Sequence, residues 1–121
     1  MKIAVTGGAG FIASHVSDAY IKAGHEVVVI DNLSTGSREN LNPKAKFIEI
    51  DITDNKIRQI FEREKFEVLN HHAAQMNVRV SVDDPMFDAH TNIIGGLNLY
   101  QSALATGVKK IVFSSTGGAI Y

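Results

Sequence analysis

No cysteine occurs among the 121 residues. The chain can therefore form neither a disulfide nor a cysteine-ligated zinc site, which fits a cytoplasmic protein. An excess of basic residues is also missing, because 12 Lys and Arg stand against 13 Asp and Glu, and this argues against a nucleic-acid partner. The longest apolar runs, such as residues 27–30, are far too short to cross a bilayer, so no membrane partner is expected. Histidine and acidic residues do not recur at metal-ligand spacing, and we predict no metal site.

The residues that are present predict one globular domain. A chain of this length with 45% hydrophobic and 21% charged residues is expected to bury a single core. Short β-rich apolar runs alternate with longer segments of helical spacing. The expected strands are residues 3–6, 27–30, 46–50, 68–71 and 111–114.

Three helices are expected between these strands. The first ends at Gly24, the second covers residues 53–65, and the third follows a capping box at 81–84, with Pro85 in its first turn, and runs to Gly107. The apolar stripe expected on the first helix is Ile12, Val16, Ala19, Tyr20 and Ala23. The apolar face expected on the third helix is Ile93, Ile94, Leu97, Tyr100 and Leu104.

This alternation predicts the α/β class, with a Rossmann-type doubly wound parallel sheet covered on both faces. The expected strand order is 3-2-1-4-5. A ligand crevice then lies at the carboxyl ends of the first and fourth strands, where the strand order reverses.

A glycine-rich turn follows the first expected strand. Gly7 and the pattern Gly8-x-Gly10-x-x-Ala13 form a dinucleotide-binding fingerprint, in which bare N–H groups at a helix N-terminus receive a pyrophosphate. Asp31 ends the second strand, and its carboxylate can accept hydrogen bonds from both ribose hydroxyls of NAD while repelling the 2′-phosphate of NADP. The alternative interpretation is an ordinary glycine turn and a solvated Asp that opens a loop.

Five ordered segments resemble the extended short-chain dehydrogenase/reductase family. They are residues 6–15, 31–36, 71–75 (His-His-Ala-Ala-Gln), 91–95 (Thr-Asn-Ile-Ile-Gly) and 113–121. Within this family the chain is most similar to the NAD-dependent epimerases and dehydratases, and especially to the UDP-glucose 4-epimerases. The resemblance covers the whole chain and implies that its cofactor is NAD.

The resemblance also implies a role for individual residues. Gly7, Gly8, Gly10, Phe11 and Ile12 lie at the pyrophosphate, and Asp31, Asn32, Ser34, Thr35 and Gly36 hold the adenosine ribose. Asp51 and Ile52 flank the adenine, Ala73, Ala74 and Gln75 line the path to the nicotinamide, and Asn92 and Ser114 also belong to the cofactor site. Thr116 takes the catalytic position that binds the 4-hydroxyl of the sugar. Other interpretations stay open: Asn92 could bond a loop carbonyl, Ala73 and Ala74 could serve close packing, and Thr116 could cap its strand.

Four features depart from the family pattern. Ala13 replaces the third glycine, His72 replaces a leucine, and Asn70 puts an amide into an apolar strand, where it needs a partner if it is buried. The family's catalytic Tyr-x-x-x-Lys does not occur among the 121 residues. We therefore expect residues 1–121 to be a partial NAD-binding Rossmann domain, truncated before the later strands and the substrate domain, and inactive alone.

The parent protein is expected to be a homodimeric enzyme that acts on a UDP-hexose. A non-catalytic module that binds or senses NAD is an alternative, as is part of a uronate epimerase or a sugar dehydratase. Gly117 and Gly118 follow Thr116, where the dehydratases of the family show Asp-Glu, and this favours an epimerase.

Overall fold

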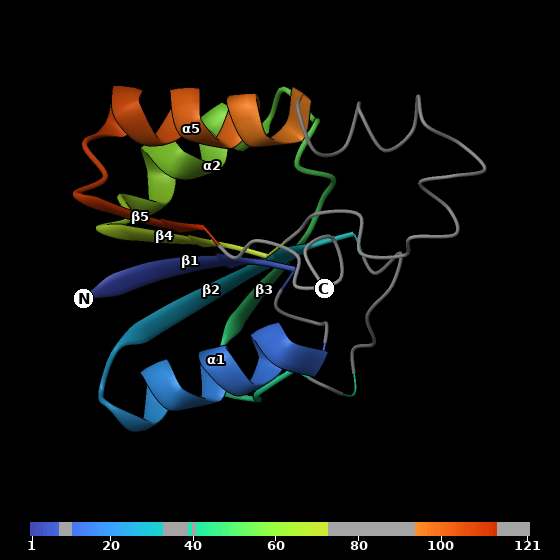
Figure 1. The fold of residues 1–121 in the computed structure, drawn as a ribbon, viewed down its shortest axis with the longest axis vertical. Helices are drawn as coiled ribbons and strands as arrows, with labels where there is room; N and C mark the ends of the chain where they lie inside the picture. Colours follow the sequence, from blue (N-terminus) through green and yellow to red (C-terminus); the bar gives the residue numbers. More distant parts are fainter. Residues whose placement is uncertain (8–10, 33–38, 40, 73–93, 114–121) are drawn as a thin grey trace, which may run out of the picture.

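The computed structural model describes residues 1–7, 11–32, 39, 41–72 and 94–113, without the side chains of residues 11, 12 and 113. The strands are β1 (Lys2–Thr6), β2 (Glu26–Asp31), β3 (Lys46–Glu49), β4 (Val68–His71) and β5 (Lys110–Phe113), and the helices are α1 (Phe11–Lys22), α2 (Ile57–Glu64) and α5 (Gly95–Thr106). All strand pairs are parallel, in the order β3-β2-β1-β4-β5 (Figure 1). The α/β Rossmann-type fold and the strand order expected from the sequence are confirmed.

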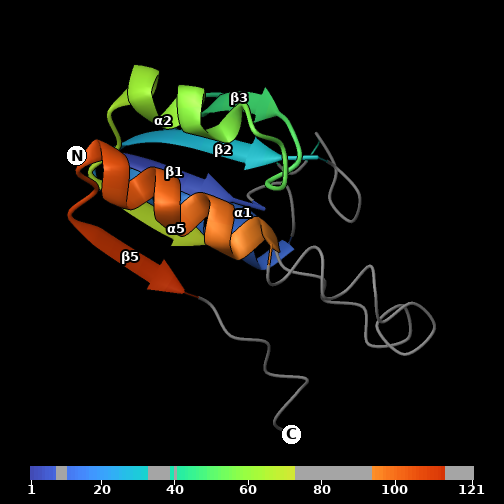
Figure 2. The same ribbon diagram turned by 90° about the horizontal axis from the view of Figure 1, so that it is seen from above.

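The sheet separates two layers of helices. Helix α1 covers one face, and α2 and α5 lie side by side over the other (Figures 1 and 2). Successive residues of β1 point to opposite faces, so Ala4 belongs to the core under α2 and α5 while Ile3 and Val5 belong to the core under α1. Strand β2 alternates in the same way, and this two-sided burial explains its unbroken apolar run.

The buried face of α1 differs from the expected apolar stripe. Ala13, Ser14 and Ser17 are buried, whereas Ala19 and Ala23 are exposed. Small residues let the helix approach the strands closely, and the Ser17 hydroxyl is satisfied by donating to the Ala13 carbonyl at 3.0 Å. Of the predicted stripe, Tyr20 packs against the core and Val16 is half-buried, so counting only apolar residues found part of the contact and missed the small buried residues.

Helix α2 begins at Ile57, four residues later than the expected start at residue 53. Two aspartates bend the preceding backbone into turns, because Asp51 Oδ1 accepts from the N–H of Thr53 at 2.9 Å and Asp54 Oδ1 accepts from the N–H of Lys56 at 2.8 Å. Aspartate side chains that bond their own backbone two residues on compete with helix formation.

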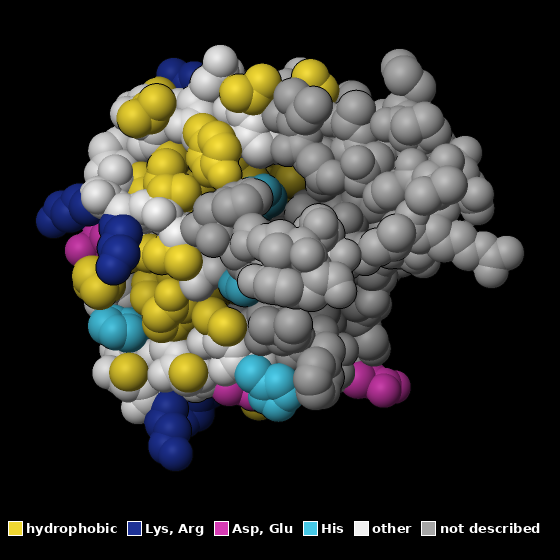
Figure 3. Space-filling model, in the orientation of Figure 1, with side chains coloured by type: hydrophobic (Ala, Val, Ile, Leu, Met, Phe, Trp, Pro, Cys, Tyr) yellow, Lys and Arg dark blue, Asp and Glu magenta, His cyan; other side chains and the backbone are white. Residues whose placement is uncertain are grey.

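Helix α5 turns much of the expected apolar face towards solvent, whereas Tyr100 of that face packs against the core and Ile93 lies outside the described residues. Ile94, Leu97 and Leu104 are 47%, 51% and 78% exposed. Figure 3 shows hydrophobic side chains on the part of the surface where α5 lies. The buried residues of this helix are Gly95, Gly96, Leu99, Ser102 and Ala103. The capping box at 81–84 and Pro85 lie outside the described residues. None of the helices in the described ranges is long and apolar enough to span a membrane.

A buried carboxylate ties the amino ends of the strands together. Glu64, the last residue of α2, is bound by Lys46 of β3 at 2.8 Å, by Lys2 of β1 at 3.1 Å and by Arg63 at 3.0 Å. The hydrogen bond from Lys46, followed by those from Lys2 and Arg63, outweighs burial and lowers the pKa of Glu64 to about 2. The carboxylate therefore stays ionised at neutral pH. It links β1 and β3 at the amino ends of the strands, opposite the expected crevice.

Candidate functional site

The glycine turn begins at the point where the strand order reverses. Gly7 follows β1 with φ 73°, a backbone conformation that favours glycine, and its N–H donates to the carbonyl of Ile30 in β2 at 2.8 Å. Helix α1 starts at Phe11, so the turn leads directly into a helix N-terminus. Ala13, at the third position of the fingerprint, is 3% exposed and packs in the core beside β1 and β2. Its methyl group fills the contact between helix and strand.

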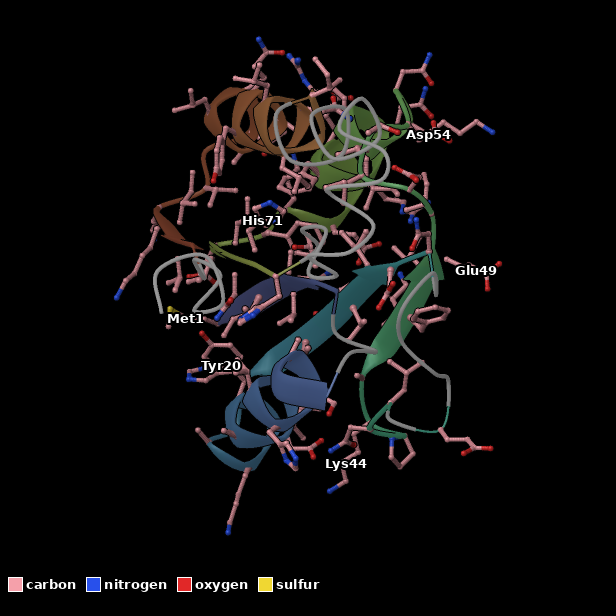
Figure 4. The ribbon with its side chains drawn as sticks, turned by 45° about the vertical axis from the view of Figure 1, so that its right-hand side comes forward. Met1, Tyr20, Lys44, Glu49, Asp54 and His71 are labelled. Atoms are coloured by element: carbon pink, nitrogen blue, oxygen red, sulfur yellow. The ribbon has the colours of Figure 1, made fainter. Side chains whose placement is uncertain are left out.

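Side chains tie the carboxyl ends of β1 and β4 together beside this turn. Thr6 Oγ1 lies 2.7 Å from Nδ1 of His71 and accepts the backbone N–H of His72 at 2.9 Å. His71 lies between the sheet and the layer of α2 and α5 (Figure 4), where its ring packs edge-on against Tyr100. Burial, followed by the charge of His72, lowers the pKa of His71 to about 4, so the imidazole is neutral at pH 7.

Asp31 is placed where a ribose-binding carboxylate is expected. It is the last residue of β2, is 8% exposed, and its carbonyl accepts the N–H of Ile50 at 3.1 Å. Asn32 follows it and donates from Nδ2 to Asp51 Oδ2 at 3.1 Å. The predicted ribose side and the predicted adenine side of the site are thus connected by a direct hydrogen bond.

The loop after β3 is organised by residues that the sequence analysis did not single out. Asn98 of α5 donates to the carbonyls of Ile52 and Asp54, at 2.7 and 2.8 Å. Ile52 is 4% exposed, with its side chain in the core against Gly95. Asn98 is one polar residue on a helix, and no local signal in the sequence marks its partner more than forty residues away. The alternative role considered for Asn92, in which a side-chain amide donates to a loop carbonyl, is the role that Asn98 has in the structure.

The side-chain amide of Asn70, which was expected to need a hydrogen-bond partner if buried, has a partner for its nitrogen but none for its oxygen among the described residues. It is 4% exposed, and its Nδ2 donates to the hydroxyl of Tyr20 on α1 at 2.8 Å. Its Oδ1 is the buried side-chain atom that lacks a hydrogen-bond partner among the residues that the structure describes. Figure 4 places Tyr20 on the α1 side of the sheet, away from His71.

The remaining predicted site residues lie outside the described ranges, so their roles stay predictions. They are Gly8, Gly10, Ser34, Thr35, Gly36, Ala73, Ala74, Gln75, Asn92, Ser114 and Thr116. The side chains of Phe11 and Ile12 are likewise not described. Within the described part of the chain, no three His, Asp or Glu residues gather as metal ligands would.

The residues that are described fit a dinucleotide. A left-handed glycine directly after β1, four residues before α1, leaves room for a diphosphate, and an acidic residue at the end of the adjacent strand suits a ribose diol. Both lie at the carboxyl edge of a parallel sheet, beside the reversal between β1 and β4.

Comparison with known proteins gives a family and close structural neighbours. The model of the "NAD dependent epimerase/dehydratase family" matches residues 3–121. The UDP-glucose 4-epimerase of Mycolicibacterium smegmatis is 43% identical over 126 aligned residues, covering 100% of this chain and 40% of that protein. The UDP-glucose 4-epimerase structure from Thermotoga maritima with UDP-glucose shares 52% identity, with a TM-score of 0.95, over 98% of this chain and 39% of that one.

A third neighbour contains the expected cofactor. The UDP-glucose 4-epimerase of Thermus thermophilus in complex with NAD shares 44% identity and a TM-score of 0.93, over 97% of this chain and 38% of that one. The chain therefore spans about two fifths of the length of the relatives it matches. The resemblance found in the sequence, and NAD as the cofactor of the family, are confirmed.

Proposed function

The chain belongs to the NAD dependent epimerase/dehydratase family, and from this premise we propose that it is the NAD-binding part of a nucleotide-sugar 4-epimerase that interconverts UDP-glucose and UDP-galactose. The observation that carries the proposal is the 52% identity and TM-score of 0.95 to the Thermotoga maritima UDP-glucose 4-epimerase. The domain assignment of residues 1–121, a UDP-hexose as the substrate and a cytoplasmic location remain predictions of the same proposal.

In this proposal each described residue acts on one part of the cofactor. Gly7 and the start of α1 receive the diphosphate, Asp31 accepts the ribose hydroxyls, and Asp51 accepts the amino group of adenine. When bound, NAD supplies the acceptor for the hydride removed from C4 of the sugar. Thr116 is proposed to orient the 4-hydroxyl. The neutral His71 is hydrogen-bonded to Thr6 and so holds the carboxyl ends of β1 and β4 together beside the proposed crevice.

The first expected result concerns the choice of cofactor. Replacing Asp31 with Ala should weaken NAD binding by on the order of 1.5–3 kcal/mol, which is the contribution of a hydrogen bond to a charged group. The wild-type chain should prefer NAD to NADP because the carboxylate repels a 2′-phosphate. Isothermal titration calorimetry of both cofactors with wild type, Asp31→Ala and the isosteric Asp31→Asn measures these affinities.

A matched control is available on the neighbouring strand. Glu49 pairs with Asp31 across β2 and β3 and is exposed, so Glu49→Ala removes the same charge from the neighbouring strand. This variant should bind NAD like wild type. Equal affinities of the wild type for NAD and NADP, or normal NAD binding by Asp31→Ala, would refute the role of Asp31.

A homodimer is proposed for the whole protein, on the support of the exposed apolar residues of α5. Ile94, which precedes α5, and Leu97 and Leu104 of this helix are exposed large apolar residues, and apolar surface of this kind marks association sites. Leu97→Glu should shift sedimentation velocity profiles towards monomer, whereas Gln59→Glu on the exposed side of α2 adds the same charge and should not. A wild-type chain that stays monomeric at high concentration would count against the dimer.

A further inference from the structure

Helix α5 contacts and hydrogen-bonds the loop between β3 and α2, residues 50–56. We propose that Gly95 and Asn98 of this helix are positioning residues for the adenine end of the bound dinucleotide. The inference rests on the proposed function, in which Asp51 and Ile52 of the loop flank the adenine. It adds residues that do not themselves touch the cofactor but decide the shape of the loop that does.

The amide of Asn98 holds the backbone of the loop. Its Nδ2 donates to the carbonyl of Ile52 at 2.7 Å and to the carbonyl of Asp54 at 2.8 Å, so both amide hydrogens are used on the loop. Asn98 is half-buried, where water competes less well for these carbonyls. Figure 4 marks Asp54 in the part of the loop that leads to α2, away from Glu49 at the end of β3.

Gly95 allows the helix to approach the loop this closely. A Cβ at Gly95 would lie 2.5 Å from Ile52 Cδ1 and 2.6 Å from Ile52 Cγ1, closer than real carbon atoms come. Ile52 is 4% exposed and belongs to the core with Leu99 and Ala103 of the same helix, so it can yield only by repacking. At the next position, a Cβ on Gly96 would meet, among the described residues, only Tyr100 Cε2, at an ordinary 3.8 Å.

The loop held in this way presents a preformed acceptor. Asp51 Oδ1 accepts from the N–H and the hydroxyl of Thr53, at 2.9 and 2.7 Å, and Oδ2 accepts from Asn32 at 3.1 Å. Asn32 directly follows Asp31, so the loop is joined to the proposed ribose carboxylate. The Asp51 carboxylate directly precedes the backbone that Asn98 holds at Ile52 and Asp54, so it meets the adenine amino group without first being ordered. This is the advantage of a site built on rigid elements.

Two adjacent glycines provide the matched test. Gly95→Ala and Gly96→Ala make the same chemical change on the same helix, and each gains helix propensity. Only Gly95→Ala pushes Ile52 and thereby the loop. We expect Gly95→Ala, and independently Asn98→Asp, to weaken NAD binding about ten-fold, on the order of one lost hydrogen bond, while Gly96→Ala binds like wild type.

Preference for adenine separates positioning from simple destabilisation. Calorimetry with NAD and with nicotinamide hypoxanthine dinucleotide, in which a carbonyl replaces the adenine amino group, gives an affinity ratio that a smaller folded fraction would not change. Wild type and Gly96→Ala should prefer NAD, and in Gly95→Ala and Asn98→Asp the ratio should fall towards one. Variants that match Gly96→Ala in both affinity and ratio would overturn the inference and leave the proposed function standing. A wild-type chain that does not bind NAD would instead overturn the proposed function.

Discussion

Residues 1–121 alone are expected to give no measurable conversion of UDP-galactose to UDP-glucose, whereas the longer protein proposed above is expected to interconvert the two sugars. Hydride removal from a secondary alcohol also requires removal of its hydroxyl proton. The family's base is absent from these residues, since Tyr20 is followed four positions later by Gly24 and Tyr100 by Leu104. Thr116, which is proposed to orient the 4-hydroxyl, has a hydroxyl pKa far too high to act as a base at neutral pH.

The structure also argues against a substitute base among the described histidines. His71 lies at the proposed crevice, but it is 2% exposed, its Nδ1 is engaged by Thr6, and burial lowers its pKa to about 4, which makes it a weak base. Burial lowers the pKa of His72 as well. General-base catalysis contributes roughly 10²–10⁴-fold, and positioning of the sugar by further residues contributes more.

A coupled assay for UDP-glucose measures this difference. It compares purified residues 1–121, the longer protein, and the longer protein with the tyrosine of its Tyr-x-x-x-Lys motif changed to phenylalanine. The first and third should be inactive. Turnover by residues 1–121 near that of the longer protein would refute the assignment of the chemistry to the missing pair. A longer protein that has the motif, binds NAD and leaves UDP-galactose unchanged would refute the proposed substrate.

Acid should destabilise the chain between about pH 6.5 and pH 4, and His71 should account for most of the loss. The unfolded chain takes up a proton on this residue near pH 6.5, whereas the folded chain does so only near pH 4, because protonation would place a charge in the core. Between these values the unfolded state binds more protons, so stability is complete above pH 6.5 and falls as the pH decreases towards 4. The shift corresponds to a loss on the order of 3 kcal/mol.

Urea unfolding at several pH values tests this expectation, because it gives the slope of the free energy of unfolding against pH. His71→Asn keeps a polar atom near the Thr6 hydroxyl but cannot titrate, so it should lower stability at pH 7 and flatten the dependence on pH. His15→Asn, on the exposed side of α1, serves as the control and should keep the wild-type slope. The role of His71 fails if His71→Asn loses as much stability between pH 6.5 and pH 4 as the wild type does.

Local patterns predicted the strands well and the helix faces poorly. The run at residues 27–30 was located correctly because a parallel strand buried on both faces is apolar throughout. The segment at 68–71 was also located correctly, although Asn70 and His71 interrupt its apolar character. On α1 and α5 most of the buried residues are Gly, Ala or Ser, with Leu99 of α5 as a large apolar exception, and a count of large apolar residues gives them little weight. Close approach of a helix to its neighbours selects small residues, and this demand is visible only when the neighbours are in place.

The sequence by itself determined the fold class, the strand order, the glycine turn and the position of Asp31, because each follows from periodicity, turn chemistry or connection rules that act within one βαβ unit. Only the tertiary structure revealed that Asn98 and Gly95 shape the loop after β3, and that the apolar stripe of α5 faces outward. It also placed His71 against Thr6, 65 residues away. These contacts join residues far apart along the chain, and their energies depend on distance and burial, which no local pattern encodes.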